Sequence, residues 1–178
     1  TVIATVVDTI IDTIYHDGAN ERKYLHKHVK WKNSEFPKPY LLWKVHKDPI
    51  ATRCIVPCHK YYTSNAANWL HAKLLPLLTF CGTILQESNV LRRVMERTTF
   101  QPRFTIASKD VTALYPNIPI EAGIAAMRLT IRRYEAEKKT SLNEHIKCET
   151  FIAMLTLVLK YNIVEYDSEF FQQQVGTA

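Results

Sequence analysis

The sequence predicts an α+β fold in which helices alternate with short antiparallel hairpins. Apolar residues recur every three or four positions over several long stretches, which is the period of amphipathic helices. Two pairs of short runs rich in β-branched and aromatic residues each flank a tight turn, which is the pattern of hairpins. With 178 residues, 47% of them hydrophobic, the chain is long enough to bury a substantial core.

In the first hundred residues we expect four helices and one basic hairpin. The helices are predicted over residues 2–14, 20–30, 63–78 and 83–97, and the strands over residues 40–46 and 52–57. Asp17-Gly18 ends the first helix, because glycine tolerates the backbone that follows a helix. Pro37 and Pro39 end the second helix and begin the extended segment. Residues 47–50 form the turn between the two strands.

The rest of the chain is predicted to begin with a strand that ends at Asp110. A helix follows Pro119, with Ile124 and Ile131 on its apolar stripe. Residues 146–161 are apolar on nearly all sides, which suits a helix buried behind a sheet. Residues 163–167 and 169–174 form a closing hairpin. A soft boundary near Pro102 divides the chain into residues 1–101 and 102–178.

The positive charge is local. The chain has a net charge of +6 and a pI near 9.1. Ten basic and three acidic residues lie between Asn20 and Tyr62, a balance of +7, so the remainder is close to neutral. A concentrated basic region favours a polyanionic partner, with nucleic acid ahead of an anionic membrane. Residues 1–15 carry Asp8 and Asp12 and lack a basic segment, so they predict neither a signal peptide nor a membrane anchor.

The cysteines indicate a reducing compartment. Cys54, Cys58, Cys81 and Cys148 form no repeated pair, and a chain this rich in apolar residues needs no disulfides. We therefore expect free thiols and an intracellular location, in the nucleus or the cytoplasm. An alternative is a zinc site from Cys54, Cys58, His59 and His46, although the paired Cys-x-x-Cys spacing of zinc knuckles is absent.

Asp110 is the leading candidate for chemistry. It ends an apolar run and is followed five residues later by Tyr115 and then by Pro116. A carboxylate at the end of a strand is a common ligand for a divalent metal that faces a phosphate. The alternative is an ordinary turn residue or helix cap.

Four passages together resemble the reverse transcriptases, with the closest likeness to those of Penelope-like retroelements. They are Lys44-Val-His-Lys-Asp-Pro49, Arg53-Cys-Ile-Val56, Ser108-Lys-Asp-Val-Thr-Ala-Leu-Tyr-Pro-Asn-Ile-Pro119 and Phe171-Gln-Gln-Gln-Val-Gly-Thr-Ala178. They occur in the family's order and approximate spacing, from about Tyr24 onward. Cys54 departs from the family, which usually has proline there. The resemblance implies a right-hand polymerase fold, with residues 1–101 as N-terminal helices and basic fingers and residues 102–178 as a partial palm.

The resemblance also implies roles for particular residues. Asp110 would be the catalytic carboxylate, and the Val111 carbonyl would be a further ligand of Mg²⁺ or Mn²⁺ in the intact parent enzyme. The residues that would bind the nucleotide are Lys44, Lys47, Arg53, Tyr115, Gln173 and Gly176. The implied partners are an RNA or DNA template with its primer and deoxynucleotide triphosphates, without a membrane. Cations suit the fingers because the leaving pyrophosphate gains negative charge.

One family motif is missing from these residues. The family's second catalytic hairpin, which carries two adjacent aspartates, and the thumb would lie after Ala178. Since one aspartate cannot hold two metal ions, we expect a fragment that does not polymerise DNA by itself. One alternative is a non-catalytic nucleic-acid-binding remnant that uses the basic fingers surface. Another is a helix-rich scaffold or interaction protein.

Overall fold

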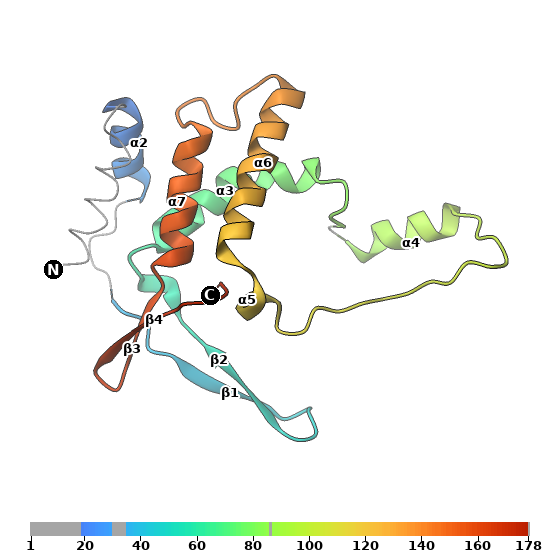
Figure 1. Cartoon of the computed structure of the whole chain (residues 1–178), viewed down its shortest axis with the longest axis horizontal. Coiled ribbons are helices and arrows are strands. Elements are labelled where there is room, and N and C mark those ends of the chain that lie inside the picture. The colour runs from blue at the N-terminus through green and yellow to red at the C-terminus, as the bar shows by residue number, and fades with distance from the viewer. Residues whose placement is uncertain (1–18, 30–34, 86, 178) are drawn as a thin grey trace.

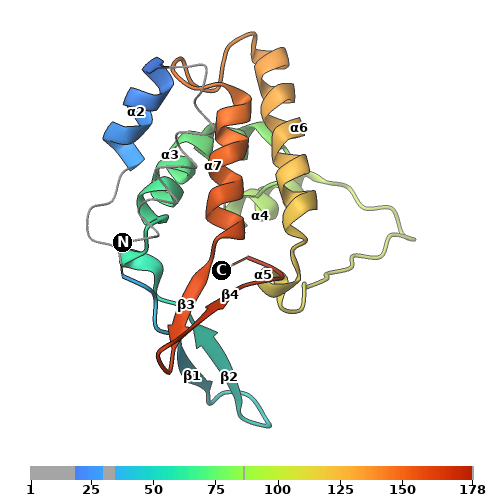
Figure 2. The same ribbon diagram turned by 60° about the vertical axis from the view of Figure 1, so that its left-hand side comes forward.

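The computed structural model describes residues 19–29, 35–85 and 87–177, and it confirms the α+β class. The helices are α2 Ala19–Val29, α3 Ser64–Phe80, α4 Ser88–Arg97, α5 Leu114–Asn117, α6 Ile120–Lys138 and α7 Cys148–Lys160, with a 3₁₀ turn, η1, at Cys58–Lys60. The strands are β1 Tyr40–Lys44, β2 Ala51–Ile55, β3 Ile163–Tyr166 and β4 Glu169–Gln172. The helix predicted over residues 2–14 lies outside the described residues. Figures 1 and 2 show α2, α3, α6 and α7 at one end of the molecule and the two hairpins, with α5, at the other.

The core lies among α2, α3, α6 and α7. Helix α7 packs against both α3 and α6, and its Phe151 and Met154 are almost completely buried. The Phe151 ring stacks on Trp69 of α3, with 5.2 Å between ring centroids. Ile124 and Ile131 of α6 are buried in the same cluster, as the predicted stripe requires. The buried face of α7 is thus covered by helices rather than by a sheet, so the prediction of a helix behind a sheet was wrong. Its run of apolar residues could not distinguish the two coverings.

Helix α2 is attached to the core by both apolar and polar contacts. Leu25 and Val29 are buried in the main cluster. The Glu21 carboxylate accepts hydrogen bonds from the backbone N–H of Lys147, at 2.9 Å, and from the Thr150 hydroxyl, at 3.3 Å. Lys147 is the N-cap residue of α7. Glu21 therefore satisfies a free donor at the start of α7 and places a negative charge at the positive end of its dipole.

Both sheets are two-stranded antiparallel hairpins, as predicted. In the first, Leu42 lies opposite Arg53 and Lys44 opposite Ala51; in the second, Val164 lies opposite Phe171. Strands β1 and β2 are largely exposed, and Figure 1 shows them projecting away from the helices.

Two expectations in the middle of the chain were wrong. Residues 104–111 form neither a strand nor a helix, so Asp110 does not end a strand. A strand needs a hydrogen-bonded neighbour, and within the described residues none pairs with this segment. Helix α4 begins at Ser88 rather than near residue 83, because a turn closed by the Ile84 N–H and the Cys81 carbonyl precedes it. In Figure 1, α4 and the connection after it extend away from the other helices.

Candidate functional site

Asp110 lies exposed in the irregular segment before α5. Its Oδ1 atom accepts a hydrogen bond from the N–H of Val111 at 2.9 Å, which ties the carboxylate to its own backbone. Within the described ranges, no three His, Cys, Asp or Glu side chains gather as a metal-binding group. Asp110 and the Val111 carbonyl are too few to hold Mg²⁺ alone, since that ion takes six oxygen ligands, only some of them water.

The zinc alternative gains no support from the positions of its residues. Cys54 is exposed on β2, and Cys58 lies in η1 with burial raising the pKa of its thiol. Cys54, Cys58, His59 and His46 are all described, and they form no metal-binding group.

A short helix, α5, presents Tyr115 to solvent. Ala113 precedes it in the left-handed conformation, with φ of 49°. The Asn117 side-chain amide donates to the carbonyl oxygens of Thr112 and Ala113, at 3.3 and 3.1 Å, and so closes the turn. The Tyr115 side chain remains 67% exposed. Sequence reasoning missed the role of Asn117, although asparagine after proline is a turn signal.

The segment that follows β4 returns to α5. The Thr177 N–H donates to the Tyr115 carbonyl at 2.9 Å. Gly176 is buried with φ of 78°, and a Cβ atom there would lie 2.5 Å from the Pro116 Cα and carbonyl oxygen. Only glycine permits this approach together with this φ. Two passages some sixty residues apart in the sequence, both part of the reverse transcriptase resemblance, therefore lie against each other.

The side-chain amide of Gln173 makes hydrogen bonds within the chain. Its Nε2 atom donates to the Val175 carbonyl at 3.0 Å, and its Oε1 atom accepts from the Asn162 amide at 3.3 Å. Its backbone N–H donates to the Asn162 carbonyl at 2.9 Å. In this arrangement Gln173 fixes the turn from β4 to Gly176, so both ends of its amide already have partners.

Two of the three predicted cations share one face of the first hairpin. Directly opposed residues of an antiparallel pair point to the same side, and neighbours along a strand alternate. Lys44, Leu42 and Arg53 therefore share a face, with Arg53 diagonal to Lys44. Trp43, 70% exposed, is on the other face with Leu41. Lys47 lies in the turn, where its N–H donates to the Lys44 carbonyl.

The base of this hairpin is fixed to the second hairpin. The Glu165 N–H of β3 donates to the Pro37 carbonyl at 3.0 Å, and the Glu165 carboxylate pairs with Lys38 at 3.2 Å. The rings of Phe36 and Phe170 are 4.7 Å apart. These contacts join the segment before β1 to the hairpin whose continuation contacts α5. Figure 2 accordingly shows β1–β2, β3–β4 and α5 at the same end of the molecule.

Two adjacent tyrosines that precede α3, Tyr61 and Tyr62, contact the end of α7. Sequence reasoning missed this contact. The hydroxyls of Tyr61 and Tyr62 both donate to the Tyr161 carbonyl, and the Ile163 N–H donates to the Tyr61 oxygen at 2.9 Å. Burial raises the pKa of both phenols. These contacts fix the start of β3 relative to α3. The only signal in the sequence is the adjacent Tyr-Tyr pair before a helix. That pattern does not identify the Tyr161 carbonyl or the Ile163 N–H as hydrogen-bond partners.

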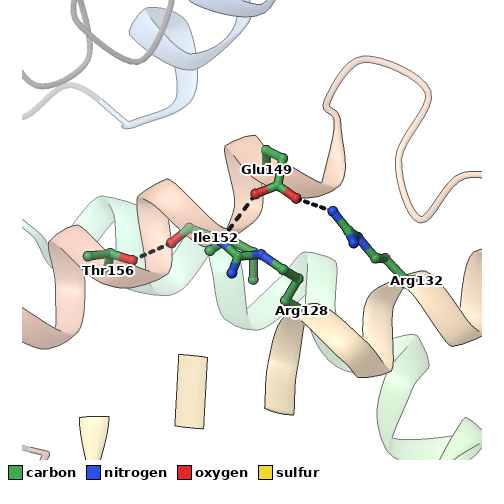
Figure 3. Close-up of polar contacts among 5 residues, drawn as sticks. All are labelled: Arg128, Arg132, Glu149, Ile152 and Thr156. Carbon is green, nitrogen blue, oxygen red and sulfur yellow. Dashed lines mark hydrogen bonds and ion pairs between the residues drawn. The ribbon is translucent and has the colours of Figure 1, made fainter. Parts of the chain in front are cut away.

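An ionic contact joins the start of α7 to α6, as Figure 3 shows. The Glu149 carboxylate pairs with Arg132 at 2.7 Å and with Arg128 at 3.2 Å. All three side chains are more than a third exposed, so the contact orients two helices and contributes little free energy. The Thr156 hydroxyl in the same view bonds the Ile152 carbonyl one turn back along α7.

Comparison with protein-family models, with curated proteins and with solved structures finds no match. Among the described helices, none combines the length and hydrophobicity needed to cross a membrane. The candidate site is therefore defined by its own geometry. Gly176 and Thr177 contact the backbones of Pro116 and Tyr115, Asp110 lies shortly before them in the sequence, and Lys44 and Arg53 are on the hairpin at the same end of the molecule.

Proposed function

We propose that the chain is the fingers and part of the palm of an RNA-directed DNA polymerase of a retroelement. The observation that carries the proposal is the contact of Gly176 and Thr177 with Pro116 and Tyr115. These residues belong to the two passages that resemble the first catalytic motif and the Gln-x-x-Gly motif of reverse transcriptases. A nucleotide site built from both motifs requires that they meet, and here they do so through backbone atoms.

The cations of the hairpin add support. Lys44, which is half-buried, and Arg53, which is exposed, lie on one face of the hairpin, in a region where basic residues outnumber acidic ones. Arginine offers a fixed fork of donors to phosphate oxygens, and lysine adds a point charge. Tyr115 is exposed on α5, at the same end of the molecule as this hairpin, so its ring is free to pack under a sugar. Gln173, by contrast, is better assigned to holding the turn than to contacting a template.

In the proposed parent enzyme, Asp110 and further carboxylates would hold Mg²⁺ or Mn²⁺, because the described residues form no metal-binding group. The bound metal would supply activation of the primer hydroxyl and neutralisation of the departing pyrophosphate. The residues described supply the phosphate-facing cations and one ligand. We therefore expect the 178 residues alone to bind template and primer without extending the primer.

The experiment uses the longer reading frame that contains the present sequence. We expect it to encode a Met-Gly continuation and an aromatic-x-Asp-Asp motif within roughly a hundred residues, and its product to extend a DNA primer on an RNA template. Asp110→Asn should abolish extension while leaving template binding intact. Extension that survives Asp110→Asn would refute the catalytic assignment.

A second candidate is nucleic-acid binding without catalysis. It is favoured by the basic face that carries Lys44 and Arg53, and by the absence of a metal-binding group around Asp110 among the described residues. A longer reading frame without the Asp-Asp motif, combined with salt-sensitive binding, would favour this candidate over the polymerase.

A further inference from the structure

A second basic surface lies at the opposite end of the molecule from the hairpin. An open hollow of about 390 Å³ is lined by Asn20, Lys23, Tyr24, Lys27, Glu144 and His145. Four of these residues come from α2, and two come from the loop between α6 and α7. Figure 1 places both elements at the end away from β1 and β2. The hollow is therefore separate from the site discussed above.

The positive charge of this hollow comes from two lysines of α2. Lys23 and Lys27 are four residues apart on α2, so they lie on one face of the helix and repel each other. Both are exposed, and neither has an ion pair with another described residue. Glu21 is the only acidic residue in α2, and its carboxylate is committed to Lys147 and Thr150 at the start of α7. Only Glu144 opposes the two lysines among the lining residues.

The opposite wall of the hollow is held in place. The N–H of His145 donates to the Asn143 side chain at 2.9 Å, which fixes the loop. The Tyr24 ring makes tilted contacts with His28 and His145, with ring centroids 4.5 and 5.1 Å away, and an edge contact with Trp69. The ring is therefore already engaged within the chain. The groups that remain for a ligand are the two ammonium groups, the Asn20 amide and the His145 ring, all of which donate to an anion.

We propose that this hollow binds a phosphate group. Lysine ammonium groups bind phosphate as point charges, and their mutual repulsion on α2 is relieved when an anion lies between them. The phosphate could belong to a nucleic-acid backbone or to a free nucleotide, and the chemistry at the lysines is the same. The proposal does not depend on polymerase activity, because none of its residues belongs to the polymerase-like passages.

The test is an NMR titration of the ¹⁵N-labelled chain with inorganic phosphate. Amide signals of Lys23, Lys27 and His145 should shift together, and K23Q/K27Q should weaken the affinity about tenfold or more. K23R/K27R should retain binding. The matched control is K138Q/K139Q at the end of α6, which removes the same charge outside the hollow and should change the affinity less than about twofold.

Competition then identifies the source of the phosphate. If a short RNA–DNA duplex displaces inorganic phosphate, the ligand is the backbone; if it does not, the ligand is a free phosphate compound. Equal affinity of K23Q/K27Q and wild type, or an equal loss in K138Q/K139Q, would overturn the proposal. K44Q/R53Q should leave the phosphate titration unchanged. Phosphate binding in the hollow can therefore fail or succeed independently of the proposed polymerase function.

Discussion

The backbone of Gly176 lies directly on that of Pro116, and a Cβ atom at residue 176 would meet the Pro116 carbonyl carbon at 2.6 Å. Together with the hydrogen bond from Thr177 to Tyr115, this contact joins the end of the second hairpin to α5. Any side chain at residue 176 would force the two passages apart. The junction thus depends on a single glycine.

Replacing this glycine tests the junction. Gly176→Ala should lower the free energy of unfolding by about 2 kcal/mol or more, because it adds both a clash and a strained φ of 78°. Urea denaturation measures the change. Gly82→Ala is the matched control, since a Cβ atom there meets nothing within 4 Å, and it should change stability by less than about 0.5 kcal/mol. Equal stability of the two variants would show that the contact does not form.

The tyrosine pair predicts a loss of stability in alkaline solution. The raised pKa values of Tyr61 and Tyr62 mean that the folded chain keeps two protons that the unfolded chain releases near pH 10. Their stabilisation is therefore complete below about pH 10 and is lost as the pH rises above it. Urea denaturation at a series of pH values should show this decline.

A variant of Tyr61 tests whether the two tyrosines cause the alkaline loss of stability. Tyr61→Phe should cost about 1–3 kcal/mol near neutral pH, because the Ile163 N–H loses its partner, and it should flatten the alkaline decline. Tyr166→Phe, on a tyrosine that is 63% exposed, should keep both the stability and the decline. An unchanged decline in Tyr61→Phe would mean that other groups cause it.

The hydrogen bonds of Glu21 at the start of α7 should contribute to the free energy of unfolding. Glu21→Ala should destabilise the chain by about 1 kcal/mol, because the Lys147 N–H and the Thr150 hydroxyl lose an acceptor. Glu87→Ala is the control, since Glu87 precedes α4 without a capping hydrogen bond. Thermal unfolding followed by circular dichroism compares the two. A cost for Glu87→Ala that matches that of Glu21→Ala would contradict the capping role.

Local sequence patterns predicted the helices and hairpins well where these depend on residues close together in the sequence. The stripe of Ile124 and Ile131, the start of α6 after Pro119 and the presence of both hairpins follow from periodicity and turn residues. The strand before Asp110 did not form, because a strand depends on a neighbour that a local pattern cannot supply. The covering of α7 by helices is likewise a property of tertiary packing.

Some features of the candidate site follow from local sequence patterns, and others depend on contacts between distant segments. Lys44 and Arg53 share one face because strand residues alternate and the register of the hairpin places Arg53 opposite Leu42. The contact of Gly176 with Pro116 and the occupied amide of Gln173 depend on a chain reversal between distant segments. The roles of Glu21, Tyr61 and Asn117 are hydrogen bonds to backbone atoms, which a residue's identity does not specify.

The proposed binding of template and primer to the face that carries Lys44 and Arg53 is measured by fluorescence anisotropy of a labelled RNA–DNA template–primer. The affinity should fall steeply with salt, and K44Q/R53Q should reduce the slope of log affinity against log salt by about two, one for each lost phosphate contact. K138Q/K139Q should leave the slope unchanged. Binding that is independent of salt, or a slope in K44Q/R53Q equal to that of the wild type, would contradict the account.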